Sequence, residues 1–240
     1  MDLNAWQKNW DELGKNDPLW LVLGNRPGGG QWGAEEFFQA GRDEIRNVFA
    51  ELDGLLVSVR RSRALDFGCG VGRLCQALAE TFEEVHGVDI SPSMIEHARR
   101  FNRFPDRCKY HVSAENGLPM FPSDHFDFVY SVLTLQHIEP RFARNYLREF
   151  VRVTRPGGVM AFQVLKPVLW RGLVPQRAAE AWRRFKHGRK PYIGMFGMSG
   201  REVTRAVEAA GAKVIQVSPL PCDTSRFLSY KYFATKTSPS

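Results

Sequence analysis

The sequence predicts an α/β fold built on a doubly wound, seven-stranded sheet whose last strand is antiparallel. Three observations support it. Short apolar runs alternate with stretches of helical periodicity through the middle of the chain, as in a parallel sheet covered on both faces. The last two strand-like segments, 213–218 and 227–235, are joined by only eight residues, too few for a helical crossover, so we expect them to pair antiparallel. The 240 residues, 43% of them hydrophobic, suit one domain with a sizeable core.

The individual elements follow in chain order. A helical period runs from Glu35 to Val59 and weakens near Gly54. Ser91 and Pro92 have the residue types of a helix N-cap and first turn. Ser199–Glu202 has the spacing of a capping box, with Met198 and Val203 as its hydrophobic staple. The expected strands before the final pair are 63–67, 85–89, 109–112, 126–131 and 159–164, and the expected helices between them are 71–80, one from 92, and 140–154.

Composition excludes several classes of protein. No apolar run approaches the roughly 20 residues that a membrane span needs. The N-terminus lacks the pattern of a secretory signal, so we expect a cytoplasmic protein. The four cysteines form no CxxC pair and no spacing typical of a metal centre, which predicts free thiols and no bound metal. The formal net charge is +7, and residues 171–190 carry +6 of it, with seven Lys and Arg against one Glu. The rest of the chain is nearly neutral, so a nucleic-acid partner is not expected.

A glycine-rich turn and a following acid describe a nucleoside pocket. The segment 66–72, DFGCGVG, ends the first strand and opens a helix, where glycines permit a tight turn and close approach of a ligand. Asp89 ends the next strand, where a carboxylate can accept both ribose hydroxyls. Such a loop can also be a plain turn, but the conjunction with Asp89 favours a site. Arg73 stands where a dinucleotide fingerprint needs glycine, and Asp66 suits an ammonium-bearing ligand, which points to S-adenosylmethionine.

With these motifs the sequence resembles the class I S-adenosylmethionine-dependent methyltransferases, of the small-molecule, methyltransferase-11-like type with a Rossmann-like sheet. The motifs are ALDFGCGVGRL at 64–74, VDIS at 88–91, SAENGLP at 113–119, FDFVYSVLTLQHI at 126–138 and RVTRPGGVM at 152–160. The resemblance implies cofactor contacts from Asp66, Gly68, Cys69, Gly70, Gly72, Asp89, Ile90, Met94, Ala114, Glu115, Ser131 and Val132. Of these, Glu115 can equally be a solvated acid, and Ile90 and Met94 can be core residues.

The resemblance implies transfer of the sulfonium methyl to an oxygen or nitrogen atom of a small acceptor, with release of S-adenosylhomocysteine. Positioning supplies most of the catalysis, and His137 is the candidate base for an acidic acceptor; a structural histidine is the alternative. The fourth strand lacks the Asn/Asp-Pro-Pro motif of nucleobase amine methyltransferases, and no acid follows it where metal-dependent catechol methyltransferases keep one. Two other classes stay open. One is a short-chain oxidoreductase, whose Tyr-x-x-x-Lys pair matches Tyr232 and Lys236, and the other is a non-catalytic S-adenosylmethionine-binding subunit.

Two segments are expected to surround the acceptor. Residues 1–59 are predicted to be a helical cover of the active site, and residues 60–240 the methyltransferase core, including a substrate-lid insertion at 166–198 with a basic helix at 176–187. Aromatic side chains in both predict a hydrophobic or aromatic acceptor. The lid arginines are either solvated or recruit an anionic substrate or membrane surface. Neither the acceptor nor the oligomeric state follows from the sequence. The candidate acceptor residues are Trp32, Phe38, Tyr130, Gln136, Trp182 and Arg183.

Overall fold

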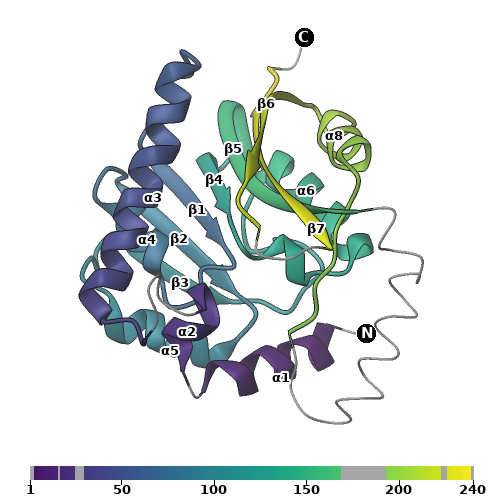
Figure 1. Ribbon diagram of the computed structural model, residues 1–240. Coiled ribbons are helices and arrows are strands. Elements are labelled where there is room, and N and C mark those ends of the chain that lie inside the picture. Colours follow the sequence, from purple (N-terminus) through teal and green to yellow (C-terminus); the bar gives the residue numbers. More distant parts are fainter. Residues whose placement is uncertain (1–2, 16, 25–29, 169–192, 223–225, 239–240) are drawn as a thin grey trace. The chain divides into compact units, whose positions relative to one another are not determined.

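The computed structural model describes residues 3–15, 17–24, 30–168, 193–222 and 226–238 (Figure 1). The chain divides into two compact units. Unit 1 comprises residues 1–115 and 126–130, and unit 2 comprises residues 116–125 and 131–240. Each unit is described by itself.

Unit 1 holds a parallel four-stranded sheet with helices around it. Strand β1 lies between β2 and β4, and β2 also pairs with β3, all in parallel register. Helix α4 packs against β1 and β2, and α3 packs along α4. The helices are α1 (Leu3–Gly14), α2 (Pro18–Leu23), α3 (Ala34–Gly54), α4 (Arg73–Ala79) and α5 (Pro92–Phe101), and the strands are β1 (Arg63–Phe67), β2 (Glu84–Asp89), β3 (Cys108–Val112) and β4 (Phe126–Ser131), whose last residue belongs to unit 2.

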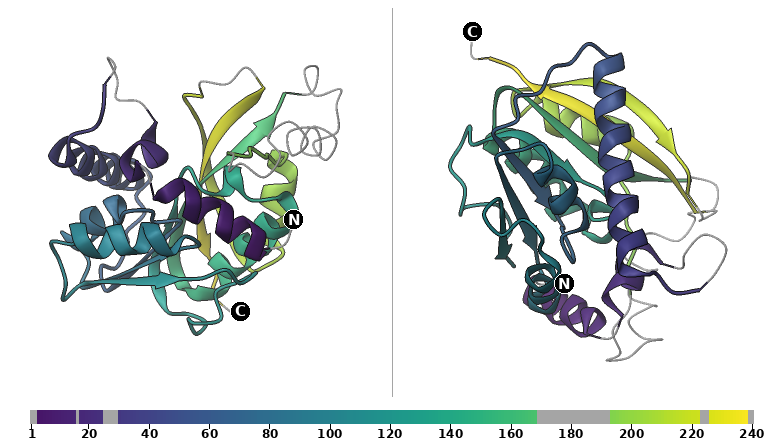
Figure 2. Two further views of the ribbon diagram at one scale, coloured as in Figure 1. Left: turned by 90° about the horizontal axis from the view of Figure 1, so that it is seen from below. Right: turned by 90° about the vertical axis from the view of Figure 1, so that its left-hand side faces the viewer.

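Unit 2 is organised around three antiparallel strands. Strand β7 pairs antiparallel with both β5 and β6, and its ladder with β6 is irregular between Val214 and Gln216. The long β5 arrow and the β6–β7 pair are visible in a second orientation (Figure 2). The elements are η1 (Leu135–His137), α6 (Pro140–Val153), β5 (Thr154–Pro167), α8 (Gly200–Glu208), β6 (Ala212–Leu220) and β7 (Phe227–Lys236).

The predicted fold class is confirmed. The seven strands have the order β3-β2-β1-β4-β5-β7-β6, and the last strand is antiparallel to its neighbours, as the eight-residue connection required. The local signals are confirmed too. The Ser91 side chain accepts a hydrogen bond from the Met94 amide at the start of α5. Ser199 and Glu202 form the reciprocal capping box of α8. Among the described residues, no helix has both the length and the apolar character needed to cross a membrane.

The helix that was expected to weaken near Gly54 ends at that residue, so the predicted break is confirmed and the apolar period beyond it, to Val59, is not helical. Leu56 takes a left-handed conformation with φ 57°. A residue with positive φ cannot continue a right-handed helix. The fifth strand is longer than predicted, since its pairing with β7 extends from Val159 to Pro167. The predicted lid helix at 176–187 lies outside the described residues, and the domain boundary at residue 59 stays a prediction.

Candidate active site

The loop between β1 and α4 depends on glycine at three alternate positions. Gly68, Gly70 and Gly72 have φ angles of 77°, 52° and 80°, a region that side chains other than glycine enter at a cost of about 1 kcal/mol or more. Space is a second constraint. A Cβ atom on Gly72 would lie 2.5 Å from the Tyr110 hydroxyl oxygen, and one on Gly70 would lie 3.0 Å from Val22 Cγ2. The predicted glycine pattern therefore has a steric and a conformational cause.

The loop is fastened to the end of β2. The amides of Gly68 and Cys69 both donate to the Val88 carbonyl, at 2.7 and 3.1 Å. The Gly70 amide donates to Asp89 Oδ2 at 2.9 Å. These bonds hold the acid that ends β2 beside the middle of the glycine loop. The two features that the sequence predicts to belong to one nucleoside pocket are thus in direct contact within unit 1.

Asp89 is held by backbone amides. Besides Gly70 it accepts a hydrogen bond from the Ser91 amide, on Oδ1 at 2.9 Å. Burial raises its pKa above the ordinary value, although these amide bonds act in the opposite direction. Each carboxylate oxygen can accept a further hydrogen bond, because each has two lone pairs. Both oxygens therefore retain acceptor capacity for ribose hydroxyls.

Asp66 lies near the end of β1, which pairs with β2 on one side and β4 on the other, two residues before the glycine loop begins. It is 1% exposed, and the Cys75 thiol donates to its Oδ2 at 3.2 Å. Burial raises the pKa of Asp66 to about 7. A cationic group near this carboxyl would favour its ionised form and bind more tightly to it. Cys75 is not among the site residues predicted from the sequence, although it lies in the first turn of α4, where its thiol reaches Asp66 on β1.

The remaining predicted cofactor residues of unit 1 have mixed surroundings. Burial raises the pKa of the Cys69 thiol to about 11, which keeps it protonated. Met94 is buried in a cluster with Phe37, Phe38 and Val71, so it is a core residue whatever else it contacts. Ile90 and Ala114 are half-buried and Glu115 is exposed. Their contacts with a cofactor stay predictions.

In unit 2, the segment after β4 holds an unusual backbone. Ser131 is buried and Val132 half-buried, and Leu133 has a left-handed conformation with φ 58°. The Leu133 amide donates to Gln163 Oε1 at 2.7 Å, and Gln163 Nε2 donates to Ser229 Oγ at the same distance. Strained residues cluster at functional sites. Gln163 is not among the predicted site residues, although it is the single polar residue in the apolar run 159–165.

His137 is held as a neutral imidazole. Its Nδ1–H donates to the Gly194 carbonyl at 2.7 Å, because a carbonyl can only accept, and Nε2 lies 3.1 Å from the side-chain nitrogen of Gln136, which donates to it. Burial lowers the pKa of His137 to about 4. A base this weak removes a proton from an alcohol or phenol poorly. These contacts favour the structural alternative, and the catalytic role stays a prediction.

The predicted acceptor residues that the structure describes have partners within the protein, and their contact with an acceptor stays a prediction. Phe38 is buried against Phe37 and Phe101. The Trp32 indole N–H donates to the Gly24 carbonyl at 3.1 Å. The Tyr130 hydroxyl donates to Glu44 Oε1 at 2.8 Å and is buried. Trp182 and Arg183, like the whole basic segment 171–190, lie outside the described residues.

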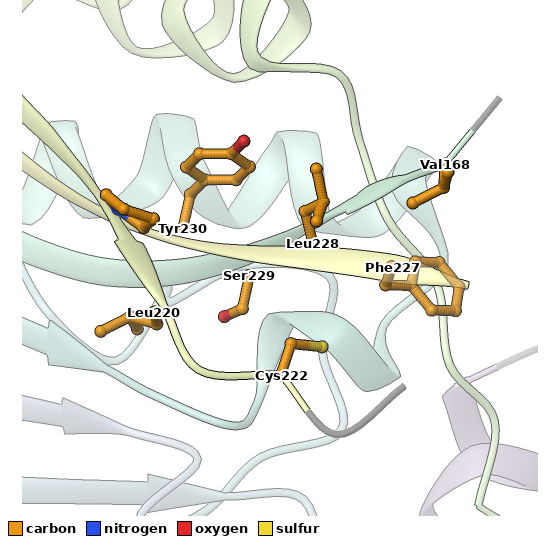
Figure 3. Close-up of a pocket in the computed structure, with 8 residues that line it drawn as sticks. Val168, Leu220, Cys222, Phe227, Leu228, Ser229 and Tyr230 are labelled. Carbon is orange, nitrogen blue, oxygen red and sulfur yellow. The ribbon is translucent and has the colours of Figure 1, made fainter. Parts of the chain in front are cut away.

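A small apolar hollow of about 240 Å³ lies in unit 2 (Figure 3). It is formed where β5 and β6 end and β7 begins, and its walls are largely aliphatic and aromatic. Ser229 and Cys222 contribute a hydroxyl and a thiol to the lining. In α/β sheets ligands bind beyond the carboxyl ends of the strands, which is where this hollow lies with respect to β5 and β6. This hollow is not among the features predicted from the sequence. Its apolar walls are Leu220, Phe227, Leu228 and Tyr230, with Val168 and Pro219.

The residues that match an oxidoreductase pair have other roles. Tyr232 lies on β7 and stacks on Phe162, with ring centroids 5.4 Å apart. Lys236 Nζ binds Asp124 Oδ1 at 2.7 Å. In a strand, positions i and i+4 lie about 13 Å apart, whereas they are neighbours on a helix. The pair is therefore not arranged as a catalytic unit. Within the described ranges no three His, Cys, Asp or Glu side chains converge to hold a metal ion.

Comparison with known proteins agrees with this geometry. Residues 65–162 match the methyltransferase domain family. Over 113 residues the chain is 35% identical to a malonyl-[acyl-carrier protein] O-methyltransferase of Halorhodospira halophila. This alignment covers 46% of this chain and 37% of that protein. The chain is also 33% identical over 121 residues to an S-adenosyl-L-methionine-dependent Diels-Alderase of Talaromyces variabilis. That alignment covers 49% of this chain and 41% of that protein. The chain thus spans about two fifths of the length of these relatives.

A solved structure shares the fold. Magnesium protoporphyrin IX methyltransferase from Synechocystis PCC 6803, crystallised with bound SAH, superposes with a TM-score of 0.64. The alignment covers 98% of this chain and 100% of that one at 17% identity. At this identity the similarity concerns the fold.

Proposed function

This chain contains a class I S-adenosylmethionine-dependent methyltransferase domain, and from that premise we propose that it transfers the sulfonium methyl group to an oxygen or nitrogen atom of a small, partly apolar acceptor. The observation that carries the proposal is the contact between the glycine loop and Asp89. Three left-handed glycines bring backbone close to a ligand, and the Gly70 amide holds the carboxylate that would accept the ribose hydroxyls.

Asp66 supports the choice of cofactor. It is buried near the end of β1 with a pKa of about 7, so an ammonium group of the methionine moiety would favour ionisation of this carboxyl. When bound, S-adenosylmethionine supplies a methyl carbon already activated by sulfonium. The protein's residues then have to hold the cofactor and place the acceptor atom in line with the carbon–sulfur bond.

The acceptor class is supported by two observations. The relative named malonyl-[acyl-carrier protein] O-methyltransferase acts, by its name, at oxygen. The hollow beside Leu228 and Tyr230 in unit 2 is largely apolar, and its polar groups are the hydroxyls of Ser229 and Tyr230 and the thiol of Cys222. Such a lining suits an aliphatic or aromatic portion of an acceptor. His137, with its lowered pKa, would bind or orient the acceptor better than it would deprotonate it.

Replacing Asp89 with Ala tests the cofactor assignment. We expect S-adenosylhomocysteine and S-adenosylmethionine to bind at least tenfold more weakly, about 1.4 kcal/mol, because two ribose hydrogen bonds are lost. Isothermal titration calorimetry measures the affinities. Asp106→Ala is the matched control, since it removes one exposed carboxylate from the same unit. Equal affinities in the wild type and Asp89→Ala would refute the ribose assignment.

A second candidate keeps the cofactor but not the methyl transfer. One relative is named as an S-adenosyl-L-methionine-dependent Diels-Alderase, and the weak basicity of His137 is compatible with a cofactor that binds without reacting. A methyl-release assay across a panel of acyl, phenolic and amine acceptors separates the candidates. Acceptor-dependent formation of S-adenosylhomocysteine supports the methyltransferase, and tight cofactor binding without turnover on the whole panel supports the alternative.

A further inference from the structure

The first two helices are fastened to the residues that follow Asp89. Asp11 of α1 accepts a hydrogen bond from the Ser93 amide at 2.8 Å, and the Ser93 hydroxyl donates to the Asp11 carbonyl at 3.0 Å. One turn earlier, Gln7 Nε2 donates to the Ile90 carbonyl at 3.0 Å. Helix α1 is therefore joined to the segment between the ribose acid and α5 by three hydrogen bonds, across more than 80 positions of sequence.

The contact at Asp11 has an electrostatic cause. Ser93 is the second residue of α5 after the Ser91 cap, so its amide is one of those that the helix leaves without an internal partner. A carboxylate at this end also interacts favourably with the helix dipole. Burial alone would raise the pKa of Asp11, but hydrogen bonds from Ser93 and Lys15 outweigh it and hold the pKa below its ordinary value. The acid is thus ionised at neutral pH.

Steric fit tightens the same contact. Gly14, near the end of α1, lies so close to α5 that a Cβ atom there would be 2.7 Å from Ser93 Oγ and 3.0 Å from Met94 Cγ. Gly14 has no positive φ, so its need for glycine comes from packing alone. A side chain at position 14 would therefore have to displace the Ser93 and Met94 side chains of α5.

Helix α2 covers the other half of the predicted cofactor site. Val22 Cγ2 lies 3.0 Å from the position that a Cβ on Gly70 would occupy. Leu19 and Leu23, with Val22, pack against the buried cluster that contains Val71 and Met94. Met94 joins the two halves, because its side chain lies against both Gly14 of α1 and Gly70 of the loop.

We propose that α1 and α2 form a clamp, residues 3–15 and 17–24, whose detachment from α5 and the glycine loop sets the rate at which the S-adenosyl nucleoside dissociates. The inference rests on the proposed function, because the glycine loop and the segment after Asp89, which would hold the nucleoside, are the places to which α2 and α1 are attached. Release of cofactor or product then requires the Asp11–Ser93 and Gln7–Ile90 bonds to break. Asp11, Gln7 and Gly14 are positioning residues in this scheme.

The test compares Asp11→Ala with Glu12→Ala in the full chain. The control removes a carboxylate from the next residue, where it binds only the exposed Lys15 among the contacts described. We expect Asp11→Ala to raise the S-adenosylhomocysteine dissociation rate, measured by stopped-flow displacement, roughly three- to tenfold, and Glu12→Ala to leave it within about twofold of wild type. Gly14→Ala, which keeps the carboxylate and pushes α1 outward, should act in the same direction as Asp11→Ala.

Hydrogen exchange supplies a readout that a purely stabilising role would not produce. In the wild type, saturating S-adenosylhomocysteine should slow exchange in peptides from residues 3–23 as well as in those from the glycine loop. Protection of the loop alone, together with an unchanged dissociation rate in Asp11→Ala and Gly14→Ala, would overturn the clamp and leave the proposed function intact. A wild type that binds neither S-adenosyl compound would overturn both.

Discussion

The buried cluster of Glu44, Arg73 and Tyr130 offers a prediction whose size can be worked out from the structure. Arg73 is 3% exposed, and its Nη2 binds Glu44 Oε2 at 2.7 Å. The other oxygen of Glu44 accepts the Tyr130 hydroxyl at 2.8 Å. One carboxylate thus serves a buried cation on α4 and a buried hydroxyl on β4, both within unit 1. Replacing Glu44 with Ala would leave two buried donors without an acceptor.

The cost follows from these contacts. Removing one partner of a buried ion pair costs about 3–5 kcal/mol, and a buried hydroxyl left unsatisfied costs about 1–3 kcal/mol. Two features reduce the total. The Glu44 side chain is 26% exposed, so water can reach part of the vacated space. The positive charge of Arg73 favours the ionised form of Asp66, and this carboxylate compensates part of the guanidinium charge. We therefore expect Glu44→Ala to lower the free energy of unfolding by about 3 kcal/mol, or the melting temperature by about 6–12 °C.

Urea denaturation followed by circular dichroism measures the change. Asp43→Ala is the matched control on the same helix, because its ion pair with Arg46 is exposed on both sides and contributes at most about 0.5 kcal/mol. A triple variant, Glu44→Leu with Arg73→Met and Tyr130→Phe, should recover most of the loss, since it removes the donors together with the acceptor. A loss in Glu44→Ala below about 1 kcal/mol, or equal to that of Asp43→Ala, would refute the reasoning.

Two further predictions concern the cofactor loop. Gly72→Ala forces an alanine to φ 80° and places its Cβ 2.5 Å from the Tyr110 hydroxyl oxygen. We therefore expect thermal denaturation to show a free energy of unfolding lower by about 2 kcal/mol, and S-adenosylmethionine to bind at least tenfold more weakly. Gly211→Ala is the control, because Gly211 has a φ of 95° but no atom within 4 Å of an added Cβ, so it isolates the cost of the backbone conformation. The second concerns pH, since the pKa of Asp66 is raised to about 7. The raised pKa means that the folded, ligand-free protein gains stability from the protonated carboxyl at low pH and loses it as pH rises through about 7. S-adenosylmethionine, which needs the ionised form, should bind progressively more weakly in calorimetry from pH 7.5 down to pH 5.5, with a slope approaching tenfold per unit at the acid end. Asp66→Asn should abolish the slope, and an equal slope in that variant would contradict the assignment to Asp66.

Signals confined to a few residues were predictable from the sequence. The glycine spacing, the Ser91–Pro92 helix start and the Ser199–Glu202 capping box each answer a local demand, either a backbone angle or an amide that a helix leaves unpaired. The antiparallel end of the sheet followed in the same way from the length of one connection. Such demands are met within a few positions of the chain, and residue types reveal them.

Contacts between distant residues were not predictable. Asp11 and Ser93 are 82 positions apart, and Glu44 and Tyr130 are 86 apart. Nothing in either segment specifies its partner, because a carboxylate on a helix surface looks the same in sequence whether it meets water or a buried donor. Phe38 and Tyr130 show the same limit: the structure gives Phe38 an aromatic contact with Phe101 and the Tyr130 hydroxyl a hydrogen bond to Glu44, neither of which the sequence indicates, while their contact with an acceptor stays a prediction.

The sequence by itself determined the fold class, the glycine loop and the acid at the end of β2, because these depend on periodicity and on backbone conformations that only glycine adopts readily. Tertiary structure alone decided the ionisation of the site. His137 and Asp66 have ordinary intrinsic acidities, and burial is the largest cause that lowers the pKa of His137 to about 4 and raises that of Asp66 to about 7. Desolvation is a property of everything packed around a group, so it exists only once the chain has folded. The attachment of the first two helices over the loop is likewise a product of packing.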